Sequence, residues 1–267
     1  MLPPTSSSAR LSRQNSSNTN MEPLSILLIA FFATLLSSMS GGGSSIIAIP
    51  LFLSMGISFP MATAMQKVSA VFWVLPTGFN YLKGKKIDWI FLTLFAGIGL
   101  IGAYVGVLVI VSIPQRILEV AIGILILLLV FYTFFRKELG LHEKEITSRF
   151  RKLLAYPFAL ILGFYESVFG SGNGILFSLV SFYTRGTDFV KALGYYFIIA
   201  FAWVTFASIL LFTKGYFDLG LFIPATIGSV AGGYIGSKYA QAKGNKFIKL
   251  MFLVVGGILG IKLILGL

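Results

Sequence analysis

The stretch LLSSMSGGGSSIIAIP, Leu35–Pro50, decides the fold, because three consecutive glycines interrupt an apolar run with no charged residue from Leu24 to Met55. Glycine is one of the poorest helix formers. The run 24–55 would be about 48 Å long as one helix, at about 1.5 Å per residue. That is too long for one crossing of a hydrocarbon core of about 30 Å and too short for two. The stretch therefore predicts two half-length helices that meet at the glycines.

Composition places the chain in a bilayer. Of its 267 residues, 57% are hydrophobic and 11% are charged, whereas a soluble domain carries about 25% charged residues. The net charge of +12 comes mostly from Lys and Arg in short loops between apolar runs, where such cations set the orientation of a membrane protein. We interpret them as topology signals and expect the lipid bilayer, and no nucleic acid, as the partner of this surface.

The chain is poor in ligands for metals. It has no cysteine and one histidine, His142, in a charged loop. Zinc, iron and haem sites need clusters of such side chains. We therefore expect no metal, no cofactor, no thiol chemistry and no catalytic residues, and an intramembrane enzyme is the least favoured function.

Two halves of the chain resemble each other across a charged linker. Eight apolar segments are visible, at 24–55, 61–82, 89–111, 117–135, 153–184, 191–213, 219–237 and 247–265. GGGSSII (Gly41–Ile47) matches GSGNGIL (Gly170–Leu176) at an offset of 129 residues, and GAYVG (Gly102–Gly106) matches GGYIG (Gly232–Gly236) at an offset of 130. Ordered matches at nearly one offset predict an internal duplication.

The duplication divides the chain into four parts. Residues 1–20 are polar and rich in Ser and Asn, and we expect a disordered tail or an upstream start. The first membrane repeat is 21–135, the charged linker loop is 136–152, and the second membrane repeat is 153–267. The glycines of the second repeat lie inside 153–184, a run as long as 24–55, so each repeat opens with a broken helix.

The broken helices permit two topologies, which the count of cations on each side distinguishes. If both turn back as re-entrant hairpins, Lys and Arg divide 15 to 5 between the two sides, whereas two broken crossings divide them 13 to 7. The re-entrant model has the sharper bias. It predicts an all-α polytopic membrane protein of two homologous halves, each with a glycine-broken helix pair and three spanning helices, arranged as inverted repeats.

A helix that begins inside the membrane forms an anion site. Its first turn has N–H groups without intrahelical partners and about half a positive charge, and non-helical backbone at this depth is tolerated where it lines a cavity. The alternative is that the glycines only permit close helix packing, as we expect for Gly102 and Gly232. The candidate substrate-binding residues are Gly41, Gly42, Gly43, Ser44, Ser45, Gln66, Lys67, Gly170, Gly172, Asn173 and Gly174.

Three ionisable residues lie inside apolar segments, where they are costly and often functional. Lys67 either attracts an anion into the cavity or snorkels to the interface, because it lies near the start of its segment. Glu166, four residues before Gly170, is a candidate carrier of a coupling proton or a partner of Lys67. Glu119 follows Arg116 by three residues, which is typical of a local ion pair.

These motifs resemble those of the TauE/SafE family of membrane proteins, known as sulfite exporters. The resemblance rests on the glycine clusters, on AMQKVSA (Ala64–Ala70) and on GFYESVFGSGNG (Gly163–Gly174), and it covers about 24–266. It implies transport of a small anion. Two positions depart from the family pattern, because Ser37 replaces an acidic residue and Tyr196 replaces a lysine, which leaves the charge and size of the substrate open.

The expected function is secondary transport of sulfite, an organosulfonate or a related oxyanion, as export across the cell membrane, coupled to protons or to the membrane potential. No ATP-binding G-x-x-x-x-G-K-[ST] loop is present. An anion channel, or a non-transporting subunit of a membrane complex, is the alternative. A homodimer is compatible with these observations.

Overall fold

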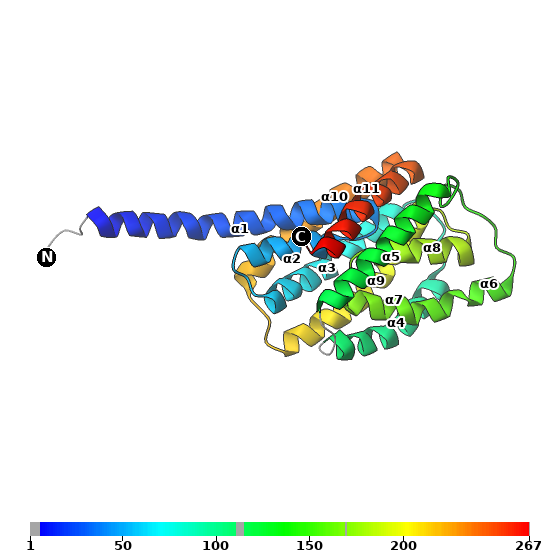
Figure 1. Cartoon of the computed structure of the whole chain (residues 1–267), viewed down its shortest axis with the longest axis horizontal. Coiled ribbons are helices and arrows are strands. Elements are labelled where there is room, and N and C mark those ends of the chain that lie inside the picture. Colours follow the sequence, from blue (N-terminus) through cyan, green and yellow to red (C-terminus); the bar gives the residue numbers. More distant parts are fainter. Residues whose placement is uncertain (1–5, 111–114, 169, 267) are drawn as a thin grey trace.

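The computed structural model describes residues 6–110, 115–168 and 170–266, and all the regular structure in them is helical (Figure 1). The half before the linker contains α1 (Ser6–Ser40), α2 (Ser44–Ser54), α3 (Phe59–Leu82), α4 (Trp89–Ile110) and α5 (Gln115–Phe135). The linker and the half after it contain α6 (Arg149–Leu153), α7 (Ala155–Val168), α8 (Asn173–Arg185), α9 (Phe189–Thr213), α10 (Leu219–Lys243) and α11 (Asn245–Leu265). The predicted all-α class is confirmed.

Five of the described helices contain a stretch long and apolar enough to cross a membrane. These stretches are Pro23–Ser40, Trp89–Gly106, Phe189–Thr213, Leu219–Lys243 and Asn245–Leu265. Helix α3, over the predicted span 61–82, is not one of them, because its first half carries Gln66 and Lys67. The chain is a multi-pass integral membrane protein.

Both predicted helix breaks are confirmed at the glycine clusters. Helix α1 ends at Ser40 and α2 begins at Ser44, and Gly41, Gly42 and Gly43 between them have φ values of 87°, 136° and 117°. Helices α7 and α8 are separated in the same way, with positive φ at Gly170 and Gly172. Residues with a Cβ adopt such angles rarely, so the glycines allow the chain to reverse direction here.

Each broken pair folds back on itself as a hairpin whose tip is the glycine cluster. Side chains from the first part of α1, such as Ile26 and Ala30, share a core cluster with Phe52 near the end of α2. In the second pair, Arg185 at the end of α8 donates a hydrogen bond to the hydroxyl of Tyr156 at the start of α7, at 3.1 Å. The two helices of each pair are therefore antiparallel.

The principal contacts join the two repeats. Helix α1 packs along α10, α4 along α7, α3 along α9 and α5 along α11. If the corresponding helices of the two halves are exchanged, the pairing of α1 with α10 becomes that of α7 with α4. The pairings of α3 with α9 and of α5 with α11 stay the same. The largest core cluster lies where these helices meet and includes Trp203, Tyr81, Phe95 and Phe177.

Small residues permit the closest of these contacts, as the sequence predicts. A Cβ on Gly102 of α4 would lie 2.0 Å from the carbonyl oxygen of Leu160 in α7. Its counterpart Gly232 of α10 would lie 2.2 Å from the carbonyl oxygen of Phe31 in α1. Any side chain at either position would force the helices apart, so the backbone contact requires glycine.

Residues 6–20, part of the segment expected to be a disordered tail or an upstream start, continue α1 as helix and project beyond the bundle (Figure 1). Extending an existing helix needs no new nucleus, which accounts for helix in a polar sequence. Residues 1–5 of the predicted tail and the side chain of Glu119 lie outside the described part of the molecule.

Candidate functional site

A small cavity lies between the two hairpin tips and is lined by α3 and α9. The space that the centre of a water molecule can occupy in it is about 30 Å³, enough for about two waters. One wall is polar and consists of Ser37, Gly42, Ser44, Ser45, Gln66, Lys67, Glu166, Gly170 and Tyr196. The other wall is apolar and consists of Ala70, Trp73, Val74, Phe197, Ala200 and Val204.

The tips of the two hairpins touch each other. A Cβ on Gly42 would lie 2.6 Å from the backbone nitrogen of Gly172. The N-terminus of α2, at Ser44, and that of α8, at Asn173, begin directly after these glycines. Two helix N-termini, each with its first-turn N–H groups and partial positive charge, therefore lie close together where the tips touch. Of the two, the N-terminus of α2 lines the cavity, through Ser44 and Ser45.

Glu166 is the centre of the polar wall. It is 4% exposed, and its Oε2 accepts hydrogen bonds from Asn173 Nδ2 at 2.8 Å and from the hydroxyl of Tyr196 at 2.9 Å. Its Oε1 lies 3.5 Å from Lys67 Nζ. A buried carboxylate is stable only when it is paired and hydrogen-bonded, and these three partners satisfy that condition.

Lys67 faces the interior and does not snorkel. The residue is 9% exposed, and its Nζ donates a 2.8 Å hydrogen bond to the backbone oxygen of Glu166, in the last turn of α7. A cation is favourable at a helix C-terminus. Gly170 makes room for this arrangement, because a Cβ there would lie 2.8 Å from Lys67 Nζ and 3.1 Å from Glu166 Oε1.

Further polar contacts cross the cavity. Gln66 Nε2 donates to Ser44 Oγ at 2.6 Å, which joins α3 to the start of α2. Ser45 and Ser171 share a hydroxyl hydrogen bond between the two tips, and Tyr165 donates its hydroxyl proton to the Ser171 carbonyl at 2.7 Å. Asn173 Oδ1 is buried and has no hydrogen-bond partner in the described part of the protein.

The predicted site residues divide into those that line the cavity and those that shape it. Gly42, Ser44, Ser45, Gln66, Lys67, Glu166 and Gly170 line it. The others lie behind the wall. Asn173 holds Glu166, whereas Gly41, Gly43, Gly172 and Gly174 serve close packing: a Cβ on Gly174 would lie 2.4 Å from the Gly41 carbonyl oxygen, and one on Gly43 would lie 2.4 Å from Leu259.

Sequence reasoning missed the apolar wall. Ala70, Trp73 and Val74 follow Lys67 by three, six and seven residues, and Ala200 and Val204 follow Tyr196 by four and eight. Such spacing places side chains on one face of a helix. The apolar wall therefore lies on the same face of α3 as Lys67 and on the same face of α9 as Tyr196. This could be predicted only after both residues are known to border the site.

The described residues contain no group of three or more His, Cys, Asp and Glu side chains that could hold a metal ion. The cavity wall presents one carboxylate, one ammonium group, hydroxyls, the amide of Gln66 and the N-terminus of α2. This set suits the binding of a small anion.

Comparison with known proteins identifies the family. Residues 26–263 match the family model described as Sulfite exporter TauE/SafE. The chain belongs to the TauE/SafE family. No solved structure gives a significant match.

Relatives of this TauE/SafE chain carry general names. It is 28% identical to a Probable membrane transporter protein of Haemophilus influenzae, over 90% of this chain and 93% of the relative. It is 25% identical to Probable membrane transporter protein YfcA of Escherichia coli, over 90% and 88%, and 26% identical to Probable membrane transporter protein ORF9 of a Sinorhizobium species, over 90% and 91%. The similarity covers both repeats and the linker.

Proposed function

We propose that this protein is a secondary transporter that exports a small anion, such as sulfite, an organosulfonate or a related oxyanion, across the cell membrane. One observation carries the proposal: the ammonium group of Lys67 and the N-terminus of α2 converge on the polar wall of one cavity. The names of the relatives support transport across a membrane.

The anion binds next to Lys67, in the position where Glu166 forms the ion pair with Lys67 in this conformation. Hydroxyl and amide donors of Ser44, Ser45 and Gln66 lie on the same wall, and helix N-termini favour negative charge. The cavity accommodates only about two waters, so binding requires the two halves to move apart. The site in this conformation is occluded.

Glu166 carries the coupling proton. While its carboxylate is charged, it occupies Lys67 and repels an incoming anion. Protonation removes that charge and frees Lys67, so proton binding and anion binding favour each other by the same factor. The proton and the anion then move together, so export is driven by the outward concentration gradient of the anion. The buried ion pair between Lys67 and Glu166 is therefore the coupling element.

The two broken helices are re-entrant, and the repeats are inverted. The end of α8 lies beside the start of α4, because Arg185 Nη1 is 3.4 Å from Asp88 Oδ2. In the same way, Phe52 near the end of α2 packs in one cluster with Phe222 near the start of α10. The two hairpins thus open toward opposite ends of the bundle, which supports alternating access by relative movement of the repeats.

The test is uptake of radiolabelled sulfite into proteoliposomes, with and without a pH gradient. Saturable uptake is expected in the parent protein. Lys67→Ala should weaken it strongly, Lys67→Arg should retain part of it, and Glu166→Gln should abolish its dependence on the pH gradient. Absence of flux for sulfite, sulfonates and carboxylates in folded protein contradicts the proposal, and flux that does not saturate identifies a channel instead.

A further inference from the structure

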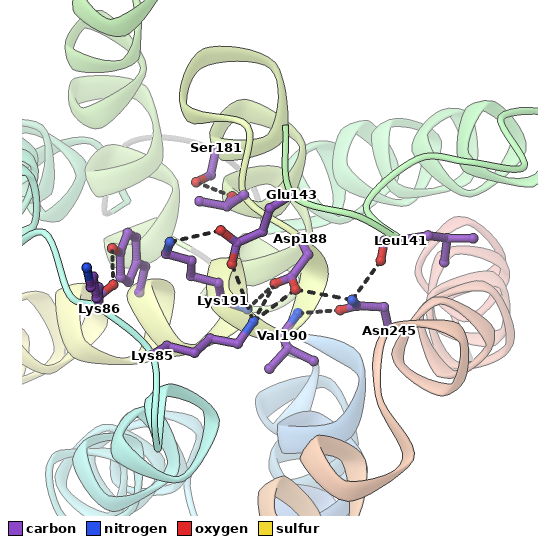
Figure 2. Close-up of polar contacts among 11 residues, drawn as sticks. Lys85, Lys86, Leu141, Glu143, Ser181, Asp188, Val190, Lys191 and Asn245 are labelled. Atoms are coloured by element: carbon purple, nitrogen blue, oxygen red, sulfur yellow. Dashed lines mark hydrogen bonds and ion pairs between the residues drawn. The ribbon is translucent and has the colours of Figure 1, made fainter. Parts of the chain in front are cut away.

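A second polar cluster lies away from the cavity, at the end of the bundle where α3 ends and α9 begins, here called the linker end (Figure 2). Lys85 Nζ lies 2.9 Å and 3.1 Å from the two carboxylate oxygens of Asp188. Asn245 Nδ2 donates to the same carboxylate at 3.2 Å. Lys191 Nζ lies 3.1 Å from Glu143 Oε2. We call these five residues the latch.

The latch joins three parts of the chain. Lys85 belongs to the first repeat, Glu143 to the linker, and Asp188, Lys191 and Asn245 to the second repeat. Asp188 also caps α9, because its Oδ1 accepts a hydrogen bond from the backbone nitrogen of Lys191 at 2.7 Å. The side chain of Asp188 is 11% exposed, so its ion pair with Lys85 is largely shielded from water.

Backbone contacts hold the linker against the same end. Phe189 N donates to the Gly140 carbonyl at 2.9 Å, and Lys144 N donates to the Gly186 carbonyl at 2.7 Å. A Cβ on Gly186 would lie 1.8 Å from the Lys144 carbonyl oxygen. The linker therefore lies directly on the loop between α8 and α9.

The latch connects the ends of two helices that line the cavity. Lys85 follows the end of α3, and Asp188 precedes the start of α9. Between the latch and the cavity, the rings of Tyr81 and Phe197 stack at 6.1 Å with an interplanar angle of 7°, and Tyr81 donates its hydroxyl proton to the Ser38 carbonyl at 2.6 Å. Between the cavity and the linker end, the path is thus blocked first by an aromatic layer and then by the latch.

Among the described residues, the opposite end has no equivalent of the ion pair between Lys85 and Asp188. The counterparts of Asp188 and Lys85, 130 residues away, are Ser58 and Gly215, and neither carries a charge. A second small cavity on that side, about 10 Å³ by the same measure, shares Gln66 with the central one and reaches Phe52 and Ala225, toward the free ends of α2 and α10. The barrier is therefore stronger at the linker end.

We propose that the latch is the gate of the linker end, so that opening the central cavity to that side requires breaking the contacts of Asp188 and Glu143. The inference rests on the proposed transport cycle, because a gate has meaning only if the cavity opens to both sides. By the positive-inside rule the linker end, with its excess of cations, faces the cytoplasm. The latch then controls the side from which an exporter loads its substrate.

The absence of cysteine from the sequence makes a direct test possible. Ala200→Cys or Val204→Cys places a single thiol in the cavity wall. A membrane-impermeant cationic thiol reagent is applied separately from each side, without substrate. Slow labelling from the linker end is expected in the otherwise unchanged protein.

Lys85→Gln should raise labelling of both reporters from the linker end roughly tenfold, because the side chain of Lys85 is 25% exposed and a partly exposed ion pair is worth less than a fully buried one. The matched control is Lys86→Gln, which removes the same charge from the neighbouring residue, whose exposed side chain points away from the latch (Figure 2). Glu143→Gln should also raise labelling, because Glu143 pairs with Lys191 at 3.1 Å and with Lys85 at 3.6 Å. Equal rates for parent, Lys85→Gln and Lys86→Gln at both reporters overturn the latch.

This experiment separates the two proposals. Labelling reports access to the cavity and needs no transported anion. If no anion flux is found while Lys85→Gln still opens the linker end, the gate stands and the proposed substrate class fails. If anion flux is found and Lys85→Gln leaves the labelling unchanged, the proposed transport stands and the gate fails.

Discussion

The two hairpin tips have the same backbone plan and different chemistry. At an offset of 129 residues, Ser37 corresponds to Glu166, Ser44 to Asn173, and Lys67 to Tyr196. Among the described residues of the cavity wall, the first half thus supplies the only ammonium group and the second half the only carboxylate. The backbone is similar at the two tips, whereas the side-chain differences make each half depend on the other for charge balance.

This asymmetry has a mechanical consequence. Lys67 on α3 and Glu166 on α7 belong to different repeats, so any movement of one repeat against the other changes the distance of 3.5 Å between their charged atoms. If both repeats carried both charges, each could be neutralised internally. The single shared ion pair therefore connects the charge state of the site to the relative position of the repeats.

Breaking the shared pair should have the largest effect. Lys67→Met leaves the buried Glu166 without its cation, and removing one partner of a buried pair costs about 3–5 kcal/mol of stability. Thermal unfolding in detergent measures the loss. Lys67→Met with Glu166→Gln should recover most of the stability without restoring anion flux. Additive losses in the double variant would show that the two residues do not interact.

The contact between the tips gives the next largest effect. Gly42→Ala places a Cβ 2.6 Å from the Gly172 backbone in a residue with φ of 136°, which should cost about 2–4 kcal/mol through strain and displacement. Denaturant or thermal unfolding of the purified protein measures it. The control is Gly257→Ala in α11, where a Cβ meets nothing within 4 Å and alanine is the better helix former. Equal stability of the two variants contradicts the tip contact.

Much of this arrangement could be predicted from the sequence, for identifiable reasons. Glycine clusters in an apolar run are strong local signals, so the breaks at Gly41 and Gly170 followed from helix propensity alone. For Lys67 the sequence left two interpretations open, because a lysine near a helix start reaches either the interface or the interior. Only the tertiary placement of the last turn of α7, where Lys67 Nζ contacts Glu166, decides between them.

The remaining features depend on contacts between distant segments. Trp73 and Phe197 belong to a chain with 26 phenylalanines, so aromatic side chains do not distinguish the cavity wall from lipid-facing surface. The latch could not be predicted from the sequence for a similar reason. Lys85, Glu143 and Asp188 lie in three separate loops, where charged residues are ordinary, and nothing local indicates that the linker brings them together.

The smallest predicted effect concerns the residue that replaces the second lysine. Tyr196→Phe removes one of the hydrogen-bond donors to Glu166 and leaves Lys67 and Asn173 in place, so the loss of stability should be about 1 kcal/mol. Thermal unfolding of Tyr196→Phe and the parent in detergent measures the loss. An unchanged unfolding temperature would mean that the hydroxyl of Tyr196 does not stabilise the site and that the ring only fills space.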